Sequence, residues 1–65
     1  MTPAHRILIV EDHKPLRSLL SFLLANAGYD TCETTDAMSA LDEASRRPPD
    51  LVLLDWQLPD MDGIK

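Results

Sequence analysis

The sequence predicts an α/β fold in which a βαβαβ chain forms a doubly wound parallel sheet. Two apolar runs, residues 7–10 and 51–54, are typical of strands that are covered on both faces. Between them, apolar residues recur at the spacing of amphipathic helices, which predicts crossover connections between parallel strands. Right-handed crossovers leave two sensible strand orders. We predict the order 2-1-3, which places the two helices on opposite faces of the sheet.

Length and charge restrict the classes of protein to consider. The chain has 65 residues and a formal net charge of −5. It therefore forms one domain at most, and its own electric field does not favour nucleic acid or an anionic membrane surface. Its single cysteine, Cys32, is interpreted as a small, partly buried filler. No apolar run is long enough to cross a membrane and no secretory signal is recognised, so a cytoplasmic protein is expected.

The first strand and the first helix have clear boundaries in the sequence. The strand spans residues 6–10 and ends abruptly at Glu11. Pro15 suits the first turn of the following helix, and Gly28 is well placed to end it in a left-handed conformation. An apolar stripe along this helix is interpreted as core, with Arg17 and Ser21 on the other side. The stripe consists of Leu16, Leu19, Leu20, Leu23, Leu24 and Ala27.

The second strand and the second helix are less marked. Residues 29–34 combine strand formers with acidic residues, which predicts a short strand near an edge. Thr35 or Asp36 is expected to cap a helix that Pro48 and Pro49 terminate. The apolar stripe of this helix consists of Ala37, Ala40, Leu41 and Ala44. Two acid-before-base pairs are expected to support it, Asp42 with Arg46 and Glu43 with Arg47.

The third strand, residues 51–54, is predicted to be buried, and a polar loop at residues 58–63 follows it. In the order 2-1-3 this strand is an edge. An edge strand this apolar is a liability in a finished domain. We therefore expect the 65 residues to be the first part of a larger sheet, truncated after the third strand.

Carboxylates follow two strands that are predicted to be neighbours. Glu11 and Asp12 come directly after the first strand, and Asp55 comes directly after the third. Neighbouring strands lie about 4.8 Å apart, so these three side chains should meet at one edge of the sheet. Oxygen ligands of this kind suit Mg²⁺, Mn²⁺ or Ca²⁺, and a carboxylate beside such a metal can attack phosphorus. The simpler alternative is that each acid is a solvated loop residue or a helix cap.

In the order and spacing of these residues, the chain resembles the N-terminal half of a response-regulator receiver domain of the CheY-like superfamily. The resemblance implies a partial flavodoxin-like fold and an incomplete receiver domain over residues 1–65. The matching segments are residues 7–12, the turn at Gly28 and Tyr29, and residues 49–63.

The resemblance also implies roles for individual residues. Asp55 matches the aspartate that accepts a phosphoryl group, and Asp12 matches the acidic Mg²⁺ ligand, with Glu11 assisting. Gln57 occupies the position whose backbone carbonyl completes the metal coordination. The phosphoryl group would come from a sensor histidine kinase or a phosphotransfer protein. The Ser or Thr and the Lys that later strands of such domains contribute cannot be assigned in this sequence.

Three functions remain open on the sequence alone. The first is a phosphoacceptor module that is a substrate of its kinase rather than an enzyme. The second is an interaction or assembly element that acts without phosphoryl transfer, for example a homodimer through its exposed sheet edge. The third is a Mg²⁺-dependent phosphohydrolase. It ranks last because the position two residues after Asp55, where a second catalytic acid would be wanted, is Gln57.

Overall fold

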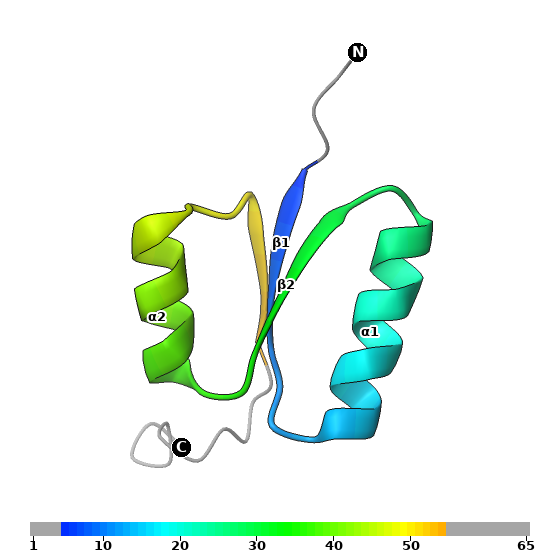
Figure 1. The fold of residues 1–65 in the computed structure, drawn as a ribbon, viewed down its shortest axis with the longest axis horizontal. Helices are drawn as coiled ribbons and strands as arrows, with labels where there is room; N and C mark the ends of the chain where they lie inside the picture. The colour runs from blue at the N-terminus through cyan, green and yellow to red at the C-terminus, as the bar shows by residue number, and fades with distance from the viewer. Residues whose placement is uncertain (1–4, 55–65) are drawn as a thin grey trace.

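The computed structural model describes residues 5–54, in which two helices cover the two faces of one parallel sheet (Figure 1). The order along the chain is βαβαβ, as predicted. The elements are β1 (Arg6–Val10), α1 (Lys14–Asn26), β2 (Asp30–Thr34), α2 (Ala37–Arg46) and β3 (Leu51–Leu54).

The sheet has the predicted strand order, β2-β1-β3, with both neighbours of β1 parallel to it. Arg6 pairs with Asp30 at one end of the β1–β2 ladder, and Val10 pairs with Leu54 at the other end of the β1–β3 ladder. Figure 1 shows α1 on one side of the sheet and α2 on the other. All three strands run in the same direction. We call the edge of the sheet where they begin the amino edge and the edge where they end the carboxyl edge.

Strand β1 forms the centre of the core. Its residues from Ile7 to Val10 are each at most 3% exposed, which confirms the prediction of a strand covered on both faces. Leu8 and Val10 pack with Ala40 of α2, and Cys32 of β2 contacts this cluster from its side. Burial, followed by the nearby Glu43 carboxylate, raises the pKa of the Cys32 thiol. Cys32 is thus a partly buried filler, as expected, and raising its pKa keeps it in the less reactive thiol form.

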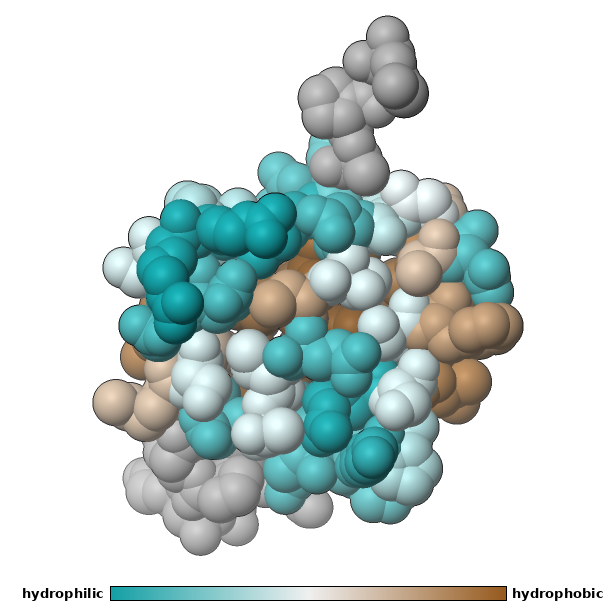
Figure 2. Space-filling model, viewed as in Figure 1, coloured by the Kyte–Doolittle hydropathy of each residue, from teal (hydrophilic) through white to brown (hydrophobic). Residues whose placement is uncertain are grey.

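Helix α1 packs on the sheet through only part of the face that was predicted, since Leu20 and Leu24 of the stripe are half-buried. Most of its leucine stripe is about half exposed, and Phe22 is exposed as well. Figure 2 shows apolar side chains gathered on the side of the molecule where α1 lies. The half-buried positions of this helix are Arg17, Leu20, Ser21 and Leu24, and its exposed leucines are Leu16, Leu19 and Leu23.

Polar partners on β2 explain why Arg17 and Ser21 of α1 also face the sheet. The hydroxyl of Ser21 lies 3.1 Å from that of Thr31, and Nε of Arg17 lies 3.3 Å from a carboxylate oxygen of Glu33. Because alternate residues of a strand share one face, Thr31 and Glu33 together give β2 a polar surface toward α1. The helix therefore turns its polar residues inward to meet that surface.

Caps and turns define the ends of both helices. Asp36 is the N-cap of α2, and its side chain accepts a hydrogen bond of 2.7 Å from the Ser39 amide. This bond lowers the pKa of the Asp36 carboxyl, since it stabilises the charged form. Gly28 has a φ of +98°, which confirms the left-handed residue expected after α1.

Helix α2 confirms one of its two predicted ion pairs and corrects the other. Asp42 pairs with Arg46, as expected. Glu43 pairs instead with Arg6 of β1, at 2.8 Å, and not with Arg47. The reason is burial: the Arg6 side chain is only 12% exposed and requires an anionic partner within the fold. Leu41, which was predicted to belong to the apolar stripe, is exposed.

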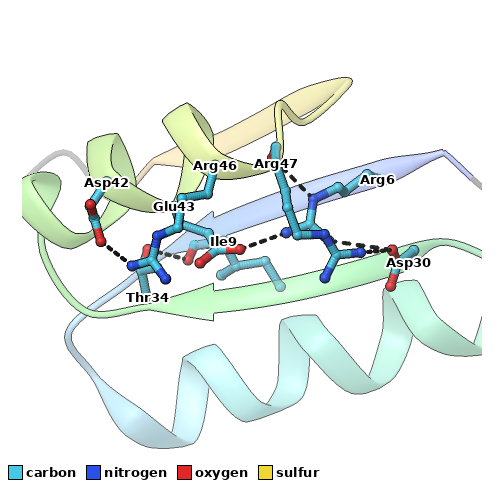
Figure 3. A network of polar contacts seen from close by, with 8 residues as sticks. All are labelled: Arg6, Ile9, Asp30, Thr34, Asp42, Glu43, Arg46 and Arg47. Carbon is cyan, nitrogen blue, oxygen red and sulfur yellow. Dashed lines mark hydrogen bonds and ion pairs between the residues drawn. The ribbon is translucent and has the colours of Figure 1, made fainter.

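The amino edge of the sheet carries a cluster of ion pairs centred on Arg6, which we call the Arg6 cluster (Figure 3). Its guanidinium contacts Glu43, Asp30 at 3.4 Å and the main-chain carbonyl of Arg47 at 3.2 Å. The Arg47 guanidinium also reaches Asp30, at 3.9 Å. These contacts connect β1, β2 and the end of α2.

Strand β3 forms where it was predicted, but its side chains are not buried. Leu51, Val52 and Leu54 are each about half exposed. Within residues 5–54 the only ladder that β3 makes is with β1, which leaves its other backbone edge without a strand. The correction concerns coverage alone, since an apolar run predicts a strand without showing how many layers cover it.

Candidate functional site

The candidate site begins with Glu11, at the carboxyl end of the central strand. Glu11 is only 6% exposed, and its amide donates to the carbonyl of Thr34 at 3.0 Å, which continues the β1–β2 ladder by one residue. One carboxylate oxygen accepts a hydrogen bond of 3.1 Å from the amide of His13. The side chain thus folds back over the turn between β1 and α1, which we call the acidic turn (residues 11–13).

Asp12, the second acid of the acidic turn, is exposed. Among residues 5–54, neither Glu11 nor Asp12 forms an ion pair with a basic side chain. Two adjacent carboxylates without a cationic partner fit a hard, oxygen-binding cation better than zinc or another soft metal. The donor set of the turn therefore suits Mg²⁺.

The register between β1 and β3 relates the third predicted acid, Asp55, to the acidic turn. Val10 pairs with Leu54, so Glu11 and Asp55 each come directly after one member of a paired couple in the sequence. Asp55 and Gln57 themselves lie outside the described residues. Within residues 5–54, no group of three or more His, Cys, Asp or Glu side chains is placed to hold a metal ion. The predicted cluster thus remains a prediction at Asp55 and Gln57, while two of its members lie at the predicted edge.

Arg17 belongs to the site, although the sequence placed it on the outer side of α1. Its Nη1 atom donates to the main-chain carbonyl of Glu11 at 3.0 Å, while Nε pairs with Glu33. The side chain is 16% exposed, so it is largely buried between the acidic turn and β2, which it contacts, rather than in solvent. The one signal in the sequence was an arginine early in the helix that directly follows two acids.

Threonine and main-chain groups fix the strand ends beside the site. Thr34, the last residue of β2, donates its hydroxyl hydrogen to the Ile9 carbonyl at 2.9 Å. Together with the hydrogen bond from the Glu11 amide to the Thr34 carbonyl, this contact holds the end of β2 against the end of β1. The acidic turn thus begins at a strand end that two hydrogen bonds hold to β2.

A parallel βαβαβ sheet with an acidic turn at its carboxyl edge defines an α/β domain with a candidate ligand site at that edge, and comparison with known proteins identifies the family. Residues 7–65 match the response regulator receiver domain, and the chain belongs to this family. It is a receiver domain of two-component signalling. Domains of this family typically depend on Mg²⁺, and they work with kinases or phosphotransfer proteins.

Individual relatives are similar over almost the whole chain. The phosphate regulon transcriptional regulatory protein PhoB of Escherichia coli is 44% identical over 62 residues, which are 95% of this chain and 27% of PhoB. Sporulation initiation phosphotransferase F of Bacillus subtilis is 43% identical over 60 residues, 92% of this chain and 48% of that protein. The chain thus spans about a quarter to a half of the length of these relatives. Neither helix among residues 5–54 has the length and apolar character needed to span a membrane.

Proposed function

We propose that this chain is the phosphoacceptor module of a two-component system, and that it takes a phosphoryl group onto Asp55 with the help of Mg²⁺. The observation that carries the proposal is the acidic turn at the carboxyl end of the central strand. In the β1–β3 register, Val10, the residue before that turn, pairs with Leu54, the residue before Asp55. Family membership and a relative named as a phosphotransferase support the same reading.

The proposed reaction is an in-line transfer from a phosphohistidine of a sensor histidine kinase or a phosphotransfer protein. A carboxylate oxygen of Asp55 forms a bond to phosphorus, the phosphorus–nitrogen bond breaks, and the imidazole leaves with a proton from solvent. Glu11 and Asp12 would hold the metal, which offsets charge on the transferred group. The backbone carbonyl of Gln57 would complete the protein ligands. The chain is then a substrate of its kinase rather than an enzyme, and the proposal keeps the cytoplasmic location expected from the sequence.

A small acyl phosphate tests this proposal without knowledge of the kinase. We expect intact-mass spectrometry of the wild-type chain to show the addition of one phosphoryl group when Mg²⁺ is present. Hydroxylamine should remove the group, because it cleaves acyl phosphates. Asp55→Asn should show no addition, whereas Asp50→Asn, a matched change outside the acidic turn, should behave as wild type. Addition to the Asp55→Asn variant would contradict the assignment.

The exposed edge of β3 favours assembly with a second copy as an alternative function. Leu51, Val52 and Leu54 are half exposed, and parallel ladders pair β3 only on its β1 side within residues 5–54. An uncovered apolar edge of this kind pairs readily with another chain, and a two-fold axis would join two β3 strands. Light scattering across protein concentrations tests this alternative. A dimer that Val52→Lys disrupts would support it, and a monomer at all concentrations would exclude it.

A further inference from the structure

Arg17 is the residue at the carboxyl edge that the proposed chemistry does not yet use. Its side chain is largely buried, and it contacts both the acidic turn and strand β2. Its Nη1 atom donates to the main-chain carbonyl of Glu11, the residue directly after β1, and its Nε atom pairs with Glu33 of β2. A planar guanidinium suits such a bridge because its donors point in fixed, divergent directions.

We infer that Arg17 is a positioning residue for Mg²⁺ binding: it fixes the main chain of the acidic turn so that Glu11 and Asp12 are presented to the cation. The inference rests on the proposed function and adds a residue to it. The atom that Arg17 holds is the carbonyl oxygen of Glu11, the residue whose carboxylate also receives the His13 amide. Two hydrogen bonds therefore hold the turn: one from Arg17 to the Glu11 carbonyl, and one from the His13 amide to the Glu11 carboxylate.

Because Arg17 is positively charged, its ion pair with Glu33 also matters for the proposed Mg²⁺ binding. A free cation beside two carboxylates would compete with Mg²⁺ for them and would lower the affinity of the site. In the structure the guanidinium donates to a carbonyl and pairs with Glu33, so it does not neutralise Glu11 or Asp12. Glu33 thus supplies the counter-charge of Arg17, and the guanidinium forms no ion pair with Glu11 or Asp12.

A purely structural role for Arg17 makes a different prediction. If Arg17 only joined α1 to the sheet, its loss would lower stability and leave the affinity of the folded chain for Mg²⁺ unchanged. If its positive charge dominated, removing it would raise that affinity. The positioning role requires the affinity to fall, because the unbound turn must then be ordered when the cation binds.

The experiment measures the dissociation constant for Mg²⁺ by calorimetry for the wild-type chain and for Arg17→Ala. We expect Arg17→Ala to weaken binding about tenfold, as is usual when a residue that orients a metal ligand is lost. Arg17→Lys should fall between the two, since a single ammonium cannot keep both contacts. Arg46→Ala removes an arginine from an exposed pair on α2 and serves as the matched control, with unchanged affinity.

A second measurement needs no metal. The amide of His13 donates to Glu11, so its hydrogen exchange reports whether the acidic turn is ordered. We expect faster exchange at His13 in Arg17→Ala, with exchange in β1 unchanged. Equal or tighter Mg²⁺ binding by Arg17→Ala, or unchanged exchange at His13, would overturn the inference and leave the proposed function intact. If the wild-type chain itself fails to bind Mg²⁺, the proposed function fails first and the inference falls with it.

Discussion

The two edges of the sheet use charged residues in opposite ways. At the amino edge, the buried guanidinium of Arg6 is paired with Glu43 and Asp30, and every contact serves to join elements of the fold. At the carboxyl edge, Glu11 and Asp12 lie side by side without an ion pair among residues 5–54, although Arg17 is within reach of the turn. The fold thus balances its charges at one end and leaves them unbalanced at the other.

This difference indicates which edge is available for a ligand. Buried charges that are fully paired have no further capacity to bind, whereas adjacent carboxylates repel each other until a proton or a cation relieves them. Parallel sheets bind ligands beyond the carboxyl ends of their strands for reasons of geometry. In this chain the electrostatics agree with that geometry.

The largest effect that would sharpen the comparison is expected from Asp12→Asn. Removing one of the two unpaired carboxylates should weaken Mg²⁺ binding by about 100-fold, which corresponds to about 2.7 kcal/mol of binding free energy. The free energy of unfolding should change by less than about 0.5 kcal/mol, since Asp12 is exposed. Calorimetry and urea denaturation measure the two quantities.

Loss of stability with unchanged Mg²⁺ affinity in Asp12→Asn would reverse the assignment of the two edges. The carboxyl edge would then be structural.

The next effect, at the amino edge, should have the opposite character. Arg6→Ala leaves the Glu43 carboxylate, only 23% exposed, without its closest partner. We expect it to lower the free energy of unfolding by about 2 kcal/mol, the usual cost of an unsatisfied, largely buried polar group. Mg²⁺ affinity at the other end of β1 should stay within error of the wild type.

Arg46→Ala is the control for Arg6→Ala, because it makes the same substitution at an exposed ion pair and shows what such a pair contributes to the free energy of unfolding. Its effect should be below about 0.5 kcal/mol. Equal losses for the two variants would show that burial of the Arg6 cluster contributes nothing.

The smallest effect concerns Asp36, an acid at the carboxyl edge that serves the fold. Its hydrogen bond to Ser39 lowers its pKa in the folded state below the ordinary 3.8, so the folded chain binds the proton less readily than the unfolded one. The contribution of Asp36 to stability is therefore full above that ordinary value, and it is lost as the pH falls through the lower, folded pKa.

The test compares urea denaturation of the wild-type chain and Asp36→Asn at about pH 6 and about pH 3. Asparagine caps a helix equally well but does not titrate. We expect the wild type to lose slightly more stability than the variant on acidification. Identical pH dependence in the two proteins would show that the cap does not depend on the charge.

Local patterns predicted the elements of the fold well because they act through neighbouring residues. The continuous apolar run of β1, the cap at Asp36 and the left-handed Gly28 all rest on local chemistry, and the structure has each of them. The face that α1 presents to the sheet was predicted only in part, since Leu20 and Leu24 are half-buried as expected but share that face with Arg17 and Ser21. Helical periodicity shows that a stripe exists, but the polar surface of β2 at Thr31 and Glu33 decided how the helix turned.

The site was predictable to the extent that strand order and register determine it. The order β2-β1-β3 is one of the two that right-handed crossovers allow, and it places Glu11 and Asp12 at the edge toward which Leu54 also leads. The role of Arg17 could not be predicted, because it depends on a contact with a main-chain carbonyl that no residue pattern records. The same holds for the pairing of Glu43 with Arg6 across the fold.

The central position of β1 also has a consequence for how the chain is made. This strand is synthesised first, but the residues that pair with Arg6 at its start lie 24 and 44 positions later in the sequence. At a translation rate of about 5–20 residues per second, its second neighbour is made roughly 2 to 9 s after it. Until then β1 has at most one of its two neighbours, β2, to pair with. A nascent chain of this kind therefore keeps its most buried strand incompletely paired until β3 has been made.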